Sequence, residues 1–309
     1  MKKFITNLFK FNIVFVLIVV LLSGFALFDN IDKNKSKNNN IITLQDKINY
    51  DNLDVLFVGS SYSYSSIKPS LLDEMSLRSY NLGIGAAGVE FYELVIDDYI
   101  ENSKSNPKVI FINVSPMTFS SKVDDYSTYP IHRYLENPKS HFQIASKYNH
   151  YDKLITMWKK SIGKGIINIL TYNFDSNIGE VTNRGYVYTD EVVNQFITQS
   201  TKHLYTPFLK EIFDDKKLAY LKNIVTKIEK KGMKVVYFEL PTNTLEKYFN
   251  INYLNQYESG LKDLSKTNNL LRIEKSLFTE LNYRNIDHMN DSGAEIVTSE
   301  VITFLNLEF

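Results

Sequence analysis

The sequence predicts an α/β fold in which a central parallel β-sheet is covered on both faces by helices, giving three layers. Short, continuous apolar runs such as residues 55–58 and 109–114 are typical of strands that are buried on both faces. Amphipathic stretches with helical periodicity, such as residues 218–231, separate these runs. Strands that alternate with helices favour a parallel, doubly wound sheet.

The individual strands and helices can be placed from periodicity and from the residues that end them. Gly232 ends a lysine-rich helix, and Pro241 ends the strand that follows it. The apolar runs predict five strands, at residues 55–58, 80–83, 109–114, 234–240 and 270–273. The helical patterns predict helices at residues 67–75, 90–100, 218–231 and 292–304.

Composition and charge exclude several classes of function. The chain has 309 residues, of which 44% are hydrophobic, and this is enough to bury one large core. Lys plus Arg equals Asp plus Glu at 35 each, so the chain lacks the clustered positive charge of a nucleic-acid-binding protein. The absence of cysteine excludes disulfides, thiolate catalysis and cysteine metal sites.

The N-terminal segment predicts a membrane anchor. Lys2, Lys3 and Lys10 precede an apolar run at residues 13–28. Together with the two residues before it, this run reaches the ~17–25 residues that span a bilayer. A cleaved signal peptide is the alternative, with residues 24–26 as a small-x-small cleavage site. We favour an uncleaved single-pass transmembrane helix, because apolar residues continue past that site; in either case we expect the body of the protein outside the cytoplasm.

The rest of the chain divides into a tether and one domain. After the anchor or signal segment at residues 1–28, the polar residues 29–49 cannot form a core and predict a tether. Residues 50–309 predict a single domain. Within it, the pattern of strands and helices fails at about residues 117–213, which we interpret as a helical insertion, because so long a loop needs structure of its own.

A serine and a histidine are the candidate catalytic residues. Ser61 follows the first strand and Gly59, so it lies at the carboxyl end of the sheet, where open parallel sheets bind ligands. His288 directly precedes the last predicted helix, in the setting Asp-His-Met-Asn-x-x-Gly-Ala. A serine hydroxyl is a poor nucleophile unless a base removes its proton. The two residues together therefore indicate nucleophilic acyl chemistry.

These segments resemble the blocks of the SGNH/GDSL hydrolase superfamily over about residues 52–116 and 217–305. The first family block, Gly-Asp-Ser, appears as Gly59-Ser60-Ser61, and the last, Asp-x-x-His, falls on residues 285–288. The resemblance implies Ser61 as the nucleophile and His288 as the base. More closely, the chain looks like the membrane-anchored branch that includes the D-alanine transfer protein and alginate O-acetylation proteins.

The resemblance also implies an oxyanion hole. The backbone N–H of Ser61 would be one donor, and the turn of the second block, at Gly85 and Ala86, would supply another. The family's third block carries an asparagine after the third strand. Here Met117 stands nearest to that place, and Ser115 is the candidate substitute.

The chain departs from the family at the acid. The family's acid lies three residues before the histidine, where this chain has Asn285, and the nearest carboxylate is Asp287. Three accounts remain open. Asp287 serves through an unusual turn, or Asn285 orients the imidazole without stabilising its charge, as in Cys-His-Asn proteases. In the third account the site is weak or inactive.

No cofactor and no metal ion are expected. None of the five histidines pairs with another at the close spacing of a motif such as H-E-x-x-H. Gly83, Gly85 and Gly88 spell G-x-G-x-x-G, but a lone match is a weak sign of a dinucleotide site. We interpret these glycines as positions of close backbone approach.

The expected function is that of an extracytoplasmic serine esterase or O-acyltransferase acting on acyl groups of a cell-surface polysaccharide or envelope polymer. The expected partners are this glycan, the membrane and, as the resemblance implies, a membrane-bound O-acyltransferase, but no nucleic acid. One alternative is a catalytically weak or inactive SGNH-fold component that binds glycan or assists such an acyltransferase. Another is a lipid- or peptide-directed hydrolase, which an apolar tunnel in the insertion would favour.

Overall fold

The computed structural model describes residues 9–15, 52–84, 87–120 and 210–308, together with the single residues 3, 146, 151, 184, 186 and 192. The chain divides into two compact units. One comprises Met1–Thr43 and Ile131–Glu180, and the other comprises Leu44–Pro130 and Val181–Phe309. In the first unit, residues 9–15 are helical and carry exposed apolar side chains. The second unit contains the sheet and both candidate catalytic residues.

The described residues include no helix that combines the length and the apolar character needed to cross a membrane. Most of the predicted anchor at residues 13–28 lies outside the described residues, and so does the predicted tether at residues 29–49. Both assignments stay predictions.

Five parallel strands form one sheet, which confirms the predicted parallel α/β core. They are β1 (Val55–Gly59), β2 (Ser79–Gly83), β3 (Val109–Val114), β4 (Lys234–Glu239) and β5 (Asn269–Arg272). Their order is β2-β1-β3-β4-β5, and every neighbouring pair is parallel. All residues of β1 and β3 are buried, as expected of central strands covered on both faces.

The strand order places a switch point between β1 and β3. The chain passes from β1 to β2 on one side, and then returns to β3 on the other side of β1. In sheets of this order, ligands bind in the crevice at the carboxyl ends of the strands where the direction reverses. Gly59 ends β1 and Val114 ends β3. Ser61 and Ser115 come soon after these ends, so both lie at the switch point.

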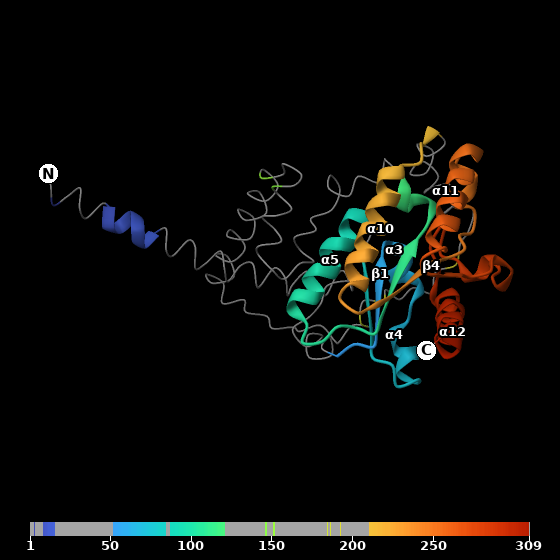
Figure 1. The fold of residues 1–309 in the computed structure, drawn as a ribbon, viewed down its shortest axis with the longest axis horizontal. Helices are drawn as coiled ribbons and strands as arrows, with labels where there is room; N and C mark the ends of the chain where they lie inside the picture. Colours follow the sequence, from blue (N-terminus) through green and yellow to red (C-terminus); the bar gives the residue numbers. More distant parts are fainter. Residues whose placement is uncertain are drawn as a thin grey trace. The chain divides into compact units, whose positions relative to one another are not determined.

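Helices cover both faces of the sheet (Figure 1). Right-handed crossovers that run in opposite directions from β1 place their helices on opposite faces. One group packs together as α3 (Ser61–Ser66), α4 (Pro69–Asp73) and α12 (Asp291–Glu308). The other group is α5 (Val89–Asn102), α10 (Asp215–Glu229) and α11 (Ile251–Leu264). Short 3-10 turns complete the described part of the domain: η1 (Pro116–Phe119), η4 (Leu245–Tyr248), η5 (Lys275–Leu277) and η6 (Glu280–Asn282).

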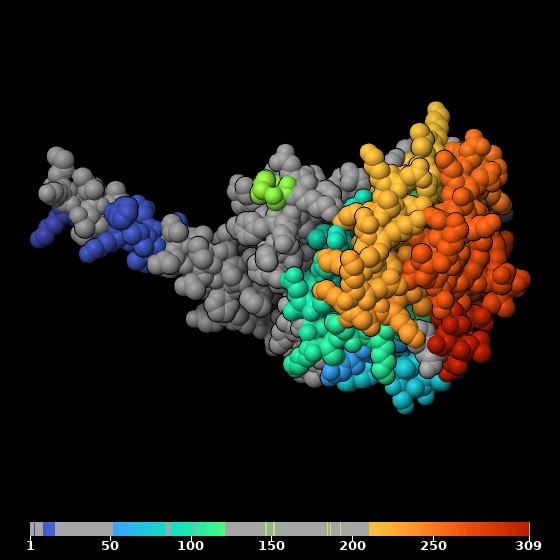
Figure 2. Space-filling model, viewed as in Figure 1, coloured from blue at the N-terminus to red at the C-terminus, as the bar shows by residue number. Residues whose placement is uncertain are grey.

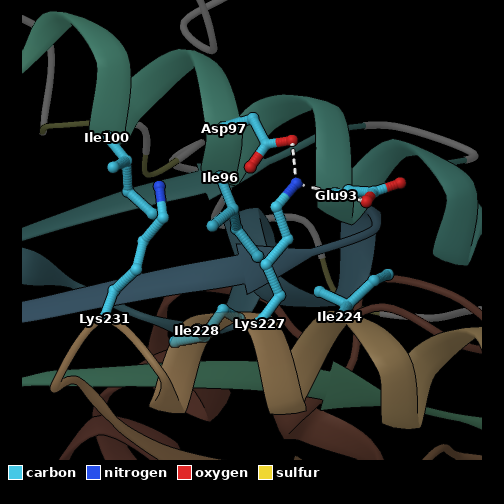
Figure 3. A pocket seen from close by; sticks show the side chains of 8 residues that line it. All are labelled: Glu93, Ile96, Asp97, Ile100, Ile224, Lys227, Ile228 and Lys231. Atoms are coloured by element: carbon cyan, nitrogen blue, oxygen red, sulfur yellow. Dashed lines mark hydrogen bonds and ion pairs between the residues drawn. The ribbon is translucent and has the colours of Figure 1, made fainter.

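Ion pairs join the helices of the second group. Lys227 of α10 lies 2.6 Å from a carboxylate oxygen of Asp97 on α5. Lys222, also on α10, pairs with Asp263 of α11. Helices α10 and α11 lie side by side in Figure 2. Isoleucines fill the groove between α5 and α10 and Lys227 crosses it, as Figure 3 shows. The groove has no room for a water-sized molecule, so it is helix packing and not a ligand site.

Two glycines let α3 lie close to the sheet. A Cβ at Gly59 would lie 2.9 Å from the Cβ of Ser63, and a Cβ at Gly83 would lie 2.6 Å from the backbone nitrogen of Tyr64, both on α3. Ordinary side chains never approach so closely, so any other residue would push α3 away. Gly83 is therefore a site of close backbone approach, as predicted.

Two local predictions differ from the structure. The helix predicted at residues 67–75 is the shorter α4, which begins at Pro69, and the preceding helix α3 is absent from the predicted elements. Helix α11 is absent from the predicted elements. Its buried face includes Tyr253 and Tyr257, whose polar hydroxyls hide the apolar pattern.

The two ends of the predicted insertion meet beside the sheet. Ser120 forms an isolated antiparallel bridge with Phe213, and the Asp214 N–H donates to the carbonyl of Phe119 at 3.0 Å. The rings of Phe119 and Phe213 pack with centroids 5.2 Å apart. Most of residues 121–209 lie outside the described residues, so the helical insertion itself stays a prediction.

Candidate active site

Ser61 is the first residue of α3, on the turn that leaves β1. Ser60 caps this helix, and its side-chain oxygen accepts the Tyr62 N–H at 3.4 Å. Asn81, buried in the middle of β2, holds the same helix by donating to the Ser63 carbonyl at 2.8 Å and accepting from the Ser63 hydroxyl at 2.9 Å. These contacts hold half-buried Ser61 on a rigid turn at the carboxyl edge of the sheet.

His288 lies on a tight turn that leads into α12. The Arg284 N–H donates to the His288 carbonyl at 2.9 Å, and Tyr283 pairs with Met289 across the turn. Asn290 closes the turn by accepting the Gly293 N–H at 3.1 Å, which caps the first turn of α12. The Asp-His-Met-Asn sequence therefore folds as one hydrogen-bonded unit that presents the imidazole.

Two acceptors face the Nδ1 nitrogen of His288. The side-chain oxygen of Asn285 lies 3.2 Å from Nδ1 in hydrogen-bond geometry. The Oδ1 of Asp287 lies closer, at 2.6 Å, but outside hydrogen-bond geometry, so this contact is an ion pair only when the ring is protonated. With acceptors on this side, the neutral ring carries its proton on Nδ1, which leaves Nε2 as the acceptor. This is the tautomer that a general base requires.

Asn285 also builds the turn itself. Its side-chain oxygen accepts the backbone N–H of Asp287 at 3.1 Å and that of His288 at 2.8 Å. The three accounts of this position stay open: the side-chain oxygen of Asn285 lies within hydrogen-bond distance of Nδ1, and Asp287 lies near the same nitrogen without a hydrogen bond. Their catalytic roles stay predictions.

Tyr62, which is not among the predicted site residues, contacts both His288 and Asp287. Its ring stacks on His288 with centroids 5.4 Å apart and planes 12° apart. Its hydroxyl donates to Oδ2 of Asp287 at 3.1 Å and lies 3.3 Å from the sulfur of Met117. Its place directly after Ser61 is the sequence signal that could have identified it. Between described residues, no hydrogen bond joins the Ser61 hydroxyl to His288; apo sites often show long catalytic contacts of this kind.

The predicted oxyanion donors are only partly described. Gly85 and Ala86 lie outside the described residues. Ser115 is buried at the start of η1, where its N–H donates to the Thr118 hydroxyl at 2.9 Å and its own hydroxyl lies 3.3 Å from the same oxygen. Met117 lies beside Tyr62, so the position of the family asparagine is at the site but has no N–H side-chain donor. The oxyanion assignments to Ser61, Gly85, Ala86 and Ser115 stay predictions.

The described residues include no group of three or more His, Asp or Glu side chains that could hold a metal ion. Catalysis at this site can be written with its own side chains, through a serine hydroxyl and an imidazole.

Lys68 links the segment that carries Ser61 to the helix that follows His288. Its ammonium lies 3.0 Å from Asp291 and 2.9 Å from Glu295, both on α12. Its backbone N–H donates to the Thr298 hydroxyl at 3.0 Å. Tyr186 adds a hydrogen bond to Asp291 at 2.7 Å. Burial lowers the pKa of Lys68, but hydrogen bonds and charge from Glu295 and Asp291 outweigh it and raise the pKa above its ordinary value.

Replacing Lys68 with methionine should lower the melting temperature at neutral pH, because two carboxylates lose their cation. Since the folded-state pKa is raised, the stabilisation is fully present below the unfolded pKa of about 10.4, and is lost as pH rises through the folded-state value. The gap between wild type and Lys68→Met should therefore close in alkaline solution. Thermal unfolding followed by circular dichroism across this pH range measures it.

Lys108→Met is the matched control, because the Lys108 side chain is 77% exposed where it pairs with Asp54. Exposed pairs contribute little to stability, so this variant should melt close to wild type. A Lys68→Met protein that melts with wild type at neutral pH would contradict the linking role of Lys68.

Comparisons with known proteins give likenesses of fold. A scan against family models and a search of curated proteins found no match. A solved structure of a GDSL-like lipase from Bacteroides thetaiotaomicron VPI-5482 is similar to this chain, with 9% identity, a TM-score of 0.42, and coverage of 91% of this chain and 100% of that chain. An acetyl xylan esterase structure is similar with 12% identity and a TM-score of 0.42, over 81% of this chain and 98% of that chain. Identities and TM-scores this low establish neither a family nor an activity for this chain.

Proposed function

We propose that this chain is a serine esterase or O-acyltransferase of the SGNH type, with Ser61 as the nucleophile and His288 as the base. The observation that carries the proposal is the stack of Tyr62 on His288, because it brings the residue next to Ser61 against a histidine from the other end of the chain. Tyr62 lies in α3, directly after β1 at the switch point where sheets of this order bind ligands, and the stack brings His288 to the same place.

The reaction follows from these positions. Ser61 Oγ attacks the carbonyl carbon of an ester while its proton moves to Nε2 of His288. The tetrahedral intermediate then collapses, the ester C–O bond breaks, and the leaving alcohol takes the proton from Nε2. Water or a sugar hydroxyl next gives a proton to Nε2 and attacks the carbonyl carbon of the acyl-serine. The bond between this carbon and Ser61 Oγ then breaks, and Oγ takes the proton back from Nε2 as the acid or the new ester leaves. The backbone N–H of Ser61 would hold the negative oxygen in both halves.

In this proposal, Asp287 and Asn285 together perform the two roles of the acid in SGNH hydrolases, which are to stabilise the imidazolium and to orient the ring. The carboxylate of Asp287, 2.6 Å from Nδ1, stabilises the imidazolium that forms during each proton transfer. Asn285 holds the ring and the turn through its single side-chain oxygen. Position 285 therefore keeps its role in orienting the ring, while the negative charge comes from Asp287.

The substrate and location extend the proposal beyond the site. We place the domain outside the cytoplasm, held by the apolar segment at residues 13–28 and acting on acyl groups of a cell-surface polysaccharide or envelope polymer. A membrane-bound O-acyltransferase would be the partner that supplies or receives the acyl group. These statements rest on the sequence and on the SGNH resemblance.

A second candidate function is a non-catalytic component that binds glycan or assists an acyltransferase through the same residues. The observations that favour it are the missing hydrogen bond between the Ser61 hydroxyl and His288, and the asparagine at position 285. Such a protein would bind acylated glycan without turnover.

Ester hydrolysis by the full-length protein in detergent separates the two. Wild type should hydrolyse p-nitrophenyl acetate or an acetylated polysaccharide, and Ser61→Ala should lose on the order of 10,000-fold in kcat, because the nucleophile is gone. Ser299→Ala is the matched control, since this hydroxyl lies on the exposed face of α12. Equal hydrolysis by Ser61→Ala and wild type would contradict the proposal.

A further inference from the structure

Tyr62 touches both the base and its charged neighbour. Its ring lies on the face of His288, and its hydroxyl donates to Oδ2 of Asp287 at 3.1 Å. The other oxygen of that carboxylate, Oδ1, lies 2.6 Å from Nδ1 of the same histidine. Tyr62 is only 4% exposed, so these contacts form in a place shielded from water.

Asp287 needs a partner of this kind because it directly precedes His288. Side chains of adjacent residues usually point in different directions, so a carboxylate here must be turned toward the ring and held there. Asn285 holds the backbone N–H groups of both residues, which shapes the turn. Rotation of the Asp287 carboxylate is limited by the Tyr62 hydroxyl, which binds the oxygen that faces away from the ring.

Met117 and Asp287 each offer the tyrosine hydroxyl an acceptor. The Asp287 oxygen lies at 3.1 Å and the sulfur of Met117 at 3.3 Å. A hydroxyl has one proton, and a thioether is a weak acceptor. A hydrogen bond to a buried carboxylate is the stronger one, because the acceptor is charged. The proton is therefore assigned to Asp287.

We infer that Tyr62 is a positioning residue that holds the Asp287 carboxylate and the His288 ring together, so that residue 287 takes over the charge normally supplied three residues before the histidine. This inference rests on the proposed function. It adds that Tyr62 is the side chain that allows Asp287 to supply the charge that Asn285 lacks. Because Tyr62 directly follows Ser61, it also sets the first turn of α3 against the turn that carries His288.

The first test follows the ring nitrogens of His288 by NMR in the full-length protein, using isotopically labelled histidine and His288→Gln for assignment. With the ring neutral, wild type should hold its proton on Nδ1, where Asp287 lies. Tyr62→Phe keeps the stacked ring and removes the hydroxyl, so the signals should move toward those of Asp287→Asn. Tyr64→Phe, a matched change on the same helix, should leave them unchanged. Identical His288 signals in Tyr62→Phe and wild type would overturn the inference, with or without turnover.

Turnover gives the second readout. Tyr62→Phe should lower kcat by roughly 10- to 100-fold, the worth of one hydrogen bond to a charged group, with little change in KM. Tyr62→Phe combined with Asp287→Asn should be no slower than Asp287→Asn alone, because the hydroxyl acts through that carboxylate. Additive losses would overturn the inference. If no form hydrolyses ester but the nitrogen signals shift as expected, the proposed function fails while the positioning role stands.

Discussion

Replacing His288 with alanine should lower kcat for ester hydrolysis on the order of 10,000-fold, and added imidazole should restore part of the loss. Without the ring, no base takes the proton of Ser61. The alanine also leaves a space against the ring of Tyr62, which stacks on His288 at 5.4 Å. Free imidazole can occupy this space and accept the proton in place of the missing side chain. Initial rates across a series of imidazole concentrations measure the rescue.

Ser61→Ala is the control for imidazole rescue. It should be as slow as His288→Ala but should not respond to imidazole, because the nucleophile itself is missing. A His288→Ala protein with wild-type activity would show that the base lies elsewhere. Rescue of both variants to the same degree would mean that imidazole attacks the ester directly.

Replacing Asn285 with leucine should lower both the stability and the activity of the protein. The change removes the oxygen that accepts the Asp287 and His288 N–H groups and that lies 3.2 Å from Nδ1. Loss of these hydrogen bonds should cost about 1–3 kcal/mol of unfolding free energy. The misplaced ring should lower kcat/KM on the order of a hundredfold. Chemical denaturation and ester kinetics on the same preparations measure the two effects.

Asn285→Asp is the matched variant, because it keeps an acceptor oxygen of the same shape and restores the family acid. Its stability should stay near that of wild type, and its kcat should equal or exceed that of wild type. Wild-type activity in Asn285→Leu would contradict the role given to this side chain. Inactivity of both wild type and Asn285→Asp would favour the non-catalytic glycan-binding alternative.

The centre of the sheet could be predicted from the sequence because β1 and β3 are buried on both faces, whereas the residues of edge strand β5 are exposed or half-buried and form only a weak apolar run. The run that became β3 has the predicted bounds, and each apolar run paired in parallel. Helix α11 could not be predicted from apolar periodicity, since tyrosines make up part of its buried face. The start of α4 follows from Pro69, but locating α3 before it requires knowing that Ser60 already caps a helix.

Single candidate residues could be proposed from the sequence, but the contacts between distant segments could not. Ser61 and His288 could be proposed from their places after a strand and before a helix. That Asp287 reaches Nδ1 depends on a turn held by the Asn285 side chain, which spacing does not reveal. The contact made by Tyr62 is harder still to predict, because its partner Asp287 lies 225 residues away in the sequence.

The most direct measurement treats the full-length protein with a fluorophosphonate serine probe and locates the adduct by mass spectrometry. The account predicts a single adduct on Ser61, abolished in Ser61→Ala, strongly slowed in His288→Ala, and unchanged in Ser299→Ala. A folded protein that takes up no probe, or that takes it up on another serine, would contradict an activated Ser61 and with it the proposed chemistry.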